Sequence, residues 1–377
     1  MDMLLAVFSY NFIVVVAVIL ADQRFKKMLL INRSDAAPVK TTYKMPVVMA
    51  LIISLMFGLF NLLVTLMKEE LGGDRLNYYL NYTGYRPSSS AGLNVVISIL
   101  RLVCSDYRIL FCFATFFTVL ITLFAYRISA DAEPEALFFL LTTQFVFFTF
   151  TGIKQCFANA FASLCIIFAL RNEGIKDTVF SIILIGLAIW FHPAGFFLIP
   201  LYILLRIKKG RWTTVLFFLL MMVSVLFFEP LLLKFAQILS RFIPSLSVKI
   251  YEYFGDAANS ALEAAGPMSV LKGIPFYIIT FVGWYKRGTL RSKLANYDNY
   301  LILSSAISMI YLASFYNSWL IRLTYFMYLP AAIFFIRVLR NLRLKNNYNV
   351  LLLSAVGLSA LLTMRYEILI FYNYGGF

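Results

Sequence analysis

The chain has 377 residues, of which 62% are apolar, 17% aromatic and 14% charged, whereas a soluble domain is about 45–50% apolar and about 25% charged. This composition excludes a water-soluble domain, so the formal charge of +15 has to be interpreted from the positions of the basic residues along the chain. The basic residues alternate by loop and form no long basic run, so we expect no nucleic acid as a partner.

Apolar runs long enough to cross a bilayer recur from one end of the chain to the other. They predict helices near residues 3–21, 45–67, 107–126, 135–151, 154–170, 178–191, 194–206, 212–228, 269–285, 298–315, 319–336 and 348–364. The sequence thus predicts an all-α, polytopic integral membrane protein with about 12 transmembrane helices. We expect a single transmembrane domain over residues 1–377.

The distribution of basic residues predicts the orientation of the chain. The first apolar run has no basic segment before it, and Arg24, Lys26 and Lys27 follow it, which indicates a retained helix with its amino terminus outside. With twelve crossings, 21 of the 33 Lys and Arg residues fall in the loops that alternation places in the cytoplasm. Both termini are therefore expected outside.

Two long segments are expected on the external side. The first, about 68–106, contains a Tyr- and Asn-rich stretch and then a moderately apolar stretch, Ala91 to Val103, which is typical of an interfacial helix. The second, about 229–268, alternates apolar residues with cations and also predicts helices on the outer surface. Because the cytoplasmic connections are short and basic, we expect any chemistry on the outer face.

Three cations are expected at the external ends of inward-running helices: Arg108, Lys154 and Arg322. The amino end of a helix and a nearby cation together favour an anion such as a phosphate. The alternative is that each side chain merely extends to the interface, as a Lys or Arg near a helix end can do. Lys154 fits that alternative least well, because a tight hairpin before it would hold its charge close to the hydrocarbon.

His192 is the only histidine, in W-F-H-P-A-G-F between two short apolar runs. It is interpreted either as a general base or phosphate hydrogen-bond donor, or as a structural histidine bonded to a backbone carbonyl. Asp74 follows two glycines and precedes Tyr and Asn residues suited to sugar hydroxyls; the alternative is a solvated loop carboxylate. With one histidine and scattered carboxylates, we expect neither a metal site nor a cofactor.

Five motifs in chain order resemble the EpsG family of Wzy-like polysaccharide polymerases. They are G-G-D-R-L-N-Y-Y, G-Y-R-P-S-S-S-A-G-L, G-I-K-Q-C-F-A-N-A, F-H-P-A-G-F-F-L-I-P-L-Y and I-R-L-T-Y-F-M-Y-L-P, which span about residues 70 to 335. The resemblance implies a GT-C-like membrane fold in the bacterial cytoplasmic (inner) membrane. It also implies an enzyme that joins undecaprenyl-diphosphate-linked oligosaccharides on the external, periplasmic face.

The family motifs assign residues of this chain to roles. Asp74 and Tyr78 match the first motif, and Lys154 with Gln155 stands where family members carry Arg-Gln. Lysine keeps the charge of that arginine but loses its bidentate geometry, so a phosphate contact there is expected to be weaker.

In this reaction the leaving diphosphate gains negative charge, which cations and helix amino ends stabilise, while a base takes the proton of the attacking hydroxyl. We assign Lys154, Arg322 and Arg86 to the diphosphate, with Arg108, Gln155 and Tyr78 as further substrate contacts, and Asp74 or His192 to the base. Expected partners are the lipid-linked glycan, membrane lipid, and a flippase and chain-length regulator of the same pathway.

Two other functions compete with the polymerase. A GT-C glycosyltransferase that uses a polyprenyl-phosphate sugar donor would hold a metal with acidic residues of the first external loop, such as Glu69, Glu70 and Asp74. A transporter or flippase would place ionisable residues near the bilayer midplane, where the apolar runs of this chain carry almost none.

Overall fold

The computed structural model describes residues 3–21, 45–66, 74–129, 136–137, 140–141, 152–171, 174–207, 270–314 and 320–341, with isolated residues between 219 and 248. Over these ranges the regular elements are all helical and none is a strand, which confirms the all-α prediction. The chain divides into two compact units, Met1–Leu204 with Tyr328–Phe377 and Leu205–Met327. Each unit is described by itself.

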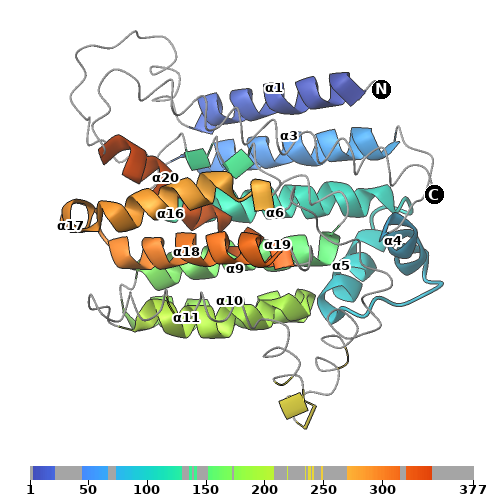
Figure 1. Ribbon diagram of the computed structural model, residues 1–377. Helices are drawn as coiled ribbons and strands as arrows, with labels where there is room; N and C mark the ends of the chain where they lie inside the picture. The colour runs from blue at the N-terminus through green and yellow to red at the C-terminus, as the bar shows by residue number, and fades with distance from the viewer. Residues whose placement is uncertain are drawn as a thin grey trace. The chain divides into compact units, whose positions relative to one another are not determined.

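The first unit is built on five long helices that pack in chain order (Figure 1). They are α1 (Met3–Ala21), α3 (Val47–Leu66), α6 (Arg108–Ile128), α9 (Ile153–Arg171) and α10 (Ile175–Phe191). Each of these helices contacts the next one in this order, and α20 (Tyr328–Asn341) contacts α9. Long helices that follow one another in the chain therefore lie side by side, as is common in helical bundles.

Helices α9 and α10 form an antiparallel pair that is fixed at both ends. At one end Phe157 stacks on Phe191 with ring centroids 4.7 Å apart. At the other end Arg171 donates from Nε and Nη2 to the buried carboxylate of Asp177, at 3.1 and 2.6 Å. Gly174, with φ of 119°, makes the reversal between the helices in a conformation that favours glycine.

Helices α3 and α6 approach closely because a glycine faces the neighbouring backbone. A Cβ atom on Gly58 would lie 3.0 Å from the carbonyl oxygen of Cys112. Further along the same pair, the buried Asn61 amide donates to the hydroxyl of Thr115. This bond satisfies two polar side chains inside an apolar helix pair, where an unmade hydrogen bond is costly.

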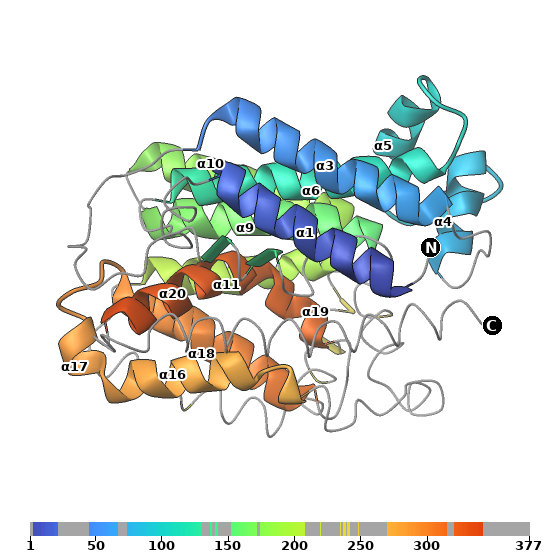
Figure 2. The same cartoon turned by 90° about the horizontal axis from the view of Figure 1, so that it is seen from above.

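Two short helices, α4 (Asp74–Thr83) and α5 (Ala91–Arg101), lie together at one end of α3 and α6 (Figures 1 and 2). Gly84 ends α4 with φ of 89°, in the left-handed region that favours glycine. The guanidinium of Arg101 covers this turn, since its Nη1 would be 3.3 Å from a Cβ atom on Gly84. The segment from 74 to 101 is thus ordered as a helical pair.

After α10 the chain reverses through a 3₁₀ turn, η2 (Pro193–Phe197), and continues in α11 (Leu198–Arg206). Pro193 is at the start of the turn, where its missing N–H leaves no hydrogen bond unmade. Gly195 packs directly on the end of α10, because a Cβ atom there would be 2.6 Å from the backbone nitrogen of Ile189. Pro193 and Gly195 therefore allow the chain to turn tightly between α10 and α11.

The second unit contains α16 (Ile274–Tyr285), α17 (Arg287–Leu290), α18 (Tyr297–Ala313), α19 (Ile321–Thr324) and the 3₁₀ turn η5 (Tyr325–Met327). Helices α16 and α18 run side by side in both views, with α17 near one end of the pair (Figures 1 and 2).

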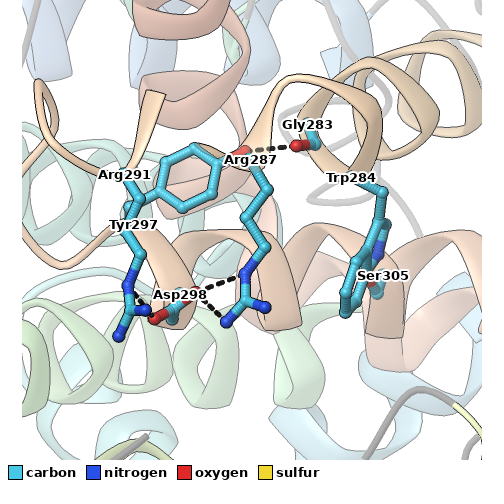
Figure 3. A network of polar contacts seen from close by, with 7 residues as sticks. All are labelled: Gly283, Trp284, Arg287, Arg291, Tyr297, Asp298 and Ser305. Carbon is cyan, nitrogen blue, oxygen red and sulfur yellow. Dashed lines mark hydrogen bonds and ion pairs between the residues drawn. The ribbon is translucent and has the colours of Figure 1, made fainter. Parts of the chain in front are cut away.

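The junction between α16 and α18 is held by one carboxylate. Asp298 accepts from Nε and Nη2 of Arg287, at 3.0 and 2.8 Å, and from Nε of Arg291 at 2.9 Å (Figure 3). Its side chain is 10% exposed, so the charge is largely withdrawn from solvent and needs these partners. Beside it, the indole of Trp284 donates to Ser305 at 3.1 Å, joining the two helices again.

Most predicted helices within the described ranges match the structure to within about three residues. Two differ by more. The run at 269–285 forms a regular α-helix only from Ile274, because Pro275 belongs in a first turn. The run at 319–336 is divided into α19, η5 and α20 and extends to Asn341. Pro330 cannot donate to the carbonyl four residues earlier, which accounts for the 3₁₀ segment before it.

Among the residues that the structure describes, four helical segments are long and apolar enough to cross a membrane: Val47–Leu66, Arg108–Ile128, Ile153–Arg171 and Ile321–Asn341. The protein is therefore a helical membrane protein. The predicted helices at 212–228 and 348–364, most of that at 135–151 and most of the external segment at 229–268 lie outside the described residues.

Candidate functional site

Three serines, Ser88 to Ser90, form the last part of the connection from α4 to α5. We call this part the serine loop. Ser90 caps α5, since its hydroxyl accepts from the backbone N–H of Leu93 at 3.2 Å. Asn94 holds the other end: its Oδ1 accepts from the N–H of Ser88 and its Nδ2 donates to the carbonyl of Ser88, both at 2.9 Å. The conformation of the serine loop is therefore fixed by contacts with the first turns of α5.

Lys154 reaches the serine loop from a helix 65 residues further along the chain. Its ammonium donates to the hydroxyl of Ser89 at 3.2 Å. Lys154 is the second residue of α9, where unpaired backbone N–H groups and the helix dipole also present positive charge. The structure thus places a cation, a helix amino end and a hydroxyl together, which is a combination suited to an anion.

The carboxyl end of α10 is attached to the same loop. The hydroxyl of Ser90 donates to the carbonyl of Phe191 at 2.8 Å, and a Cβ atom on Gly92 would lie 3.0 Å from the Phe191 ring. The next residue is His192. The serine loop therefore contacts both Lys154 and Phe191, the residue that precedes His192. The sequence alone did not indicate that Lys154 and His192 are linked through one loop.

His192 lies at the junction of α10 and η2 in an extended conformation, with φ of −150° and ψ of 132°. Its Nδ1 accepts a hydrogen bond from the backbone N–H of Ala194 at 3.1 Å. An Nδ1 that accepts carries no proton, so the neutral ring has its proton on Nε2. The choice between a functional and a structural histidine stays a prediction.

Arg86 lies two residues before the serine loop. Its side chain is exposed. Its backbone is held on both sides, because its N–H donates to Leu80 at 3.2 Å and its carbonyl accepts from Asn81 at 2.7 Å. A second cation therefore lies two residues before the loop that Lys154 contacts.

Tyr78 and Gln155 are both buried. Tyr78 is 5% exposed and packs edge-on against Phe111 of α6, with ring centroids 5.9 Å apart. Gln155 follows Lys154 in α9 and is 2% exposed. In this conformation the two side chains support the helices that carry the site, and their assigned contact with substrate stays a prediction.

Arg108 begins α6 and has a carboxylate partner. Its backbone N–H donates to Oδ1 of Asp106 at 2.9 Å, and its Nη1 lies 3.3 Å from Oδ2 of the same residue. The guanidinium also lies 5.7 Å from the centroid of the Tyr107 ring. Asp106 partly neutralises this cation, which makes Arg108 a weaker candidate for the diphosphate than Lys154.

Asp74 is the first residue of α4, and its side chain is outside the described part of the chain. The next residue, Arg75, lies over the ring of Phe111 at 5.8 Å, and burial lowers the pKa of its guanidinium. Arg322 lies on α19 in the second unit, so its placement beside Lys154 stays a prediction.

Within the described ranges, no group of three or more His, Cys, Asp and Glu residues is arranged as a metal site. Glu69 and Glu70 lie outside those ranges.

The serine loop and Asp106 were not among the predicted site residues. A signal for Ser90 was present, because a serine directly before an apolar helical run is a common helix cap. No comparable signal linked Ser89 to Lys154 or Ser90 to Phe191, since these contacts join distant parts of the sequence.

Comparison with known proteins identifies the family of the chain. The sequence model of the EpsG family matches residues 51–374, which include most of α3, the helices from α4 to α20 and all the candidate residues above. Searches of curated proteins and of solved structures each found no match. Because the family match covers most of its length, the chain belongs to the EpsG family.

Proposed function

We propose that the protein is a polymerase that joins undecaprenyl-diphosphate-linked oligosaccharide units into a surface polysaccharide. Membership of the EpsG family and the apolar helices support a membrane protein of polysaccharide biosynthesis. The proposal adds the donor, the repeat-unit substrate and a GT-C-like arrangement of about 12 transmembrane helices in one domain.

The observation that carries this proposal is the group formed by Lys154, the serine loop and the end of α10. Lys154 contacts Ser89 at 3.2 Å, and Ser90 contacts Phe191 at 2.8 Å, immediately before His192. A glycosyl transfer from a lipid diphosphate develops negative charge on the departing phosphate oxygen. Preorganised cations and N–H donors stabilise such a charge without reorganising during the reaction.

We assign the diphosphate to Lys154 and the amino end of α9, with Arg86 and Arg322 as additional cations. His192 contributes the N–H of Nε2 to the diphosphate or to a sugar oxygen. To act as a base, His192 would need a free lone pair on Nε2 and a proton on Nδ1, which would then oppose the N–H of Ala194. The base role therefore falls to Asp74, at the start of α4.

In the proposed step, a sugar hydroxyl of the incoming lipid-linked unit attacks the anomeric carbon of the growing chain. The bond from that carbon to the diphosphate breaks, and undecaprenyl diphosphate leaves with the bonding electron pair. The carboxylate of Asp74 takes the hydroxyl proton as the new glycosidic bond forms.

We place the site on the external, periplasmic face of the bacterial inner membrane. The distribution of basic residues supports this orientation, since 21 of the 33 Lys and Arg residues fall in the loops assigned to the cytoplasm. The proposed partners are the lipid-linked glycan, membrane lipid, and a flippase and chain-length regulator of the same pathway.

The glycan banding pattern of a deletion strain tests this function. A strain without the protein should retain a single repeat unit on its acceptor and lose the ladder of longer chains, and the wild-type gene should restore the ladder. A strain that also lacks the single unit would indicate a transferase acting earlier or a transporter. Chelator-sensitive activity of the purified protein would favour the metal-dependent glycosyltransferase.

A further inference from the structure

We propose that Ser90 is a positioning residue that orients His192 as an Nε2–H donor. The consequence for catalysis rests on the proposed function, while the effect on the imidazole does not. Ser90 touches no reacting group in this proposal and acts through the backbone of Phe191.

The Ser90 hydroxyl makes hydrogen bonds of opposite sense. It accepts from the N–H of Leu93 at 3.2 Å within its own helix, and it donates to the carbonyl of Phe191 at 2.8 Å, 101 residues away in the sequence. A longer contact of 3.4 Å joins the same hydroxyl to the carbonyl of Trp190. The side chain is 7% exposed, so water does not readily replace either bond. Ser90 thereby links the amino end of α5 to the carboxyl end of α10.

This link acts on the peptide unit that carries His192. The carbonyl of Phe191 and the N–H of His192 belong to the same rigid peptide group. The N–H of His192 donates to the carbonyl of Ala188 at 2.9 Å, so both sides of the peptide are held. With the peptide fixed, the bond from Ala194 to Nδ1 at 3.1 Å sets the ring orientation and places the proton on Nε2.

A helix cap alone would be a purely structural role, and two substitutions separate it from positioning. Ser90→Asp keeps an oxygen that accepts from Leu93 but removes the hydroxyl that donates to Phe191 and sets a carboxylate against its carbonyl. Ser90→Thr retains both bonds. The control is Ser98→Ala, because Ser98 is on the same helix and its exposed hydroxyl donates to the carbonyl of Asn94, at 2.9 Å, within α5 itself.

The imidazole can be observed directly because His192 is the only histidine of the chain. The probe is full-length protein labelled with ¹⁵N-histidine, purified with a histidine-free tag and reconstituted in lipid nanodiscs. Spectra are recorded about two pH units above the ordinary histidine pKa of about 6.5. Wild type, Ser90→Thr and Ser98→Ala should show one signal pair with the proton on Nε2.

Ser90→Asp should shift or broaden that pair, because the ring is no longer held in one orientation. A spectrum of folded Ser90→Asp identical to wild type would overturn the proposal. So would a wild-type ring protonated on Nδ1. If Ser90→Asp does not yield folded protein, Ser90→Gly replaces it, because glycine is tolerated as a helix cap and lacks the hydroxyl that donates to Phe191. Circular dichroism then confirms that the helices are retained.

Activity provides the second measurement. We expect Ser90→Asp to lower kcat by roughly 10–100-fold, the effect of a small displacement of a catalytic group. The same change in a His192→Ala background should cause almost no further loss, because both act on one interaction. Losses that multiply would refute action through His192. If wild type does not polymerise, the proposed function fails, but the spectra still decide whether Ser90 orients the ring.

Discussion

Replacing Lys154 by alanine is the substitution that most directly removes the proposed diphosphate contact. Lys154 is the second residue of α9 and its ammonium lies 3.2 Å from the hydroxyl of Ser89. Lys154→Ala removes the side-chain charge and leaves the amino end of the helix in place. Lys154→Arg keeps the charge and provides two parallel N–H donors for phosphate oxygens.

The expected loss of kcat in Lys154→Ala follows from the proposed role of Lys154 as a donor to the leaving diphosphate. Removing one preorganised donor from a developing oxyanion typically raises the barrier by about 2.7–4 kcal/mol, which corresponds to about 10²–10³-fold in kcat. The contribution of Lys154 to the stability of the fold is expected to be small, since the side chain is partly exposed and its bond to Ser89 is made at a helix end. A large loss of turnover should therefore occur without loss of folded protein.

Lys176 provides the matched control. It is also the second residue of a long helix, α10, and is exposed. The assay measures initial rates of chain extension with purified variants in liposomes and lipid-linked repeat units as substrate. Lys154→Ala should lose about 10²–10³-fold, while Lys154→Arg and Lys176→Ala stay close to wild type. Near-normal turnover by well-folded Lys154→Ala would refute the assignment of Lys154 to the leaving group.

Three further predictions use other parts of the structure. His192→Gln should keep much of the chain-extension rate, since its amide still donates one hydrogen bond, whereas His192→Ala should not; equal losses would count against the donor role. Asp298→Asn should lower the free energy of unfolding by about 3–5 kcal/mol because two arginines lose a largely buried partner. Asp106→Asn, which affects a more exposed pair, should cost less than about 1 kcal/mol. Both values can be measured by denaturation in detergent, and a similar cost for the two would be a contradiction. Asn159→Leu should preserve or raise the melting temperature, because the amide is 1% exposed and makes no hydrogen bond to the described protein. A large drop would mean that the amide is bonded to ordered water.

Local sequence was sufficient to predict most of the described helices. Apolar runs determined α3, α6, α9 and α10 to within a few residues, because burial in a membrane bundle requires continuous apolar segments of that length. Proline accounts for the deviations at α16 and before α20. The number of transmembrane helices remains a prediction, since four candidates occur within the described ranges.

The candidate site was only partly predictable, for a physical reason. Lys154 was placed correctly at the start of a helix by its position after a glycine and before an apolar run. Its contact with Ser89 and the contact of Ser90 with Phe191 depend on how α5, α9 and α10 pack, and one sequence contains no local signal for that packing.

The sequence alone also could not predict which carboxylate pairs with Arg108 or which nitrogen of His192 carries the proton. Arg108 was predicted to bind an anionic substrate. In the structure its guanidinium contacts the carboxylate of Asp106, two residues earlier. The proton position on His192 follows from a backbone N–H two residues later, whose direction is set by the 3₁₀ turn and not by residue type.

The most direct test of the central claim is reconstitution of the purified wild-type protein with chemically defined undecaprenyl-diphosphate-linked repeat units as the only substrate. Products are resolved by length after release of the lipid. The proposal predicts a ladder that grows by whole repeat units, with one undecaprenyl diphosphate released for each bond formed. Transfer of single sugars, or release of monophosphate with no ladder, would contradict it.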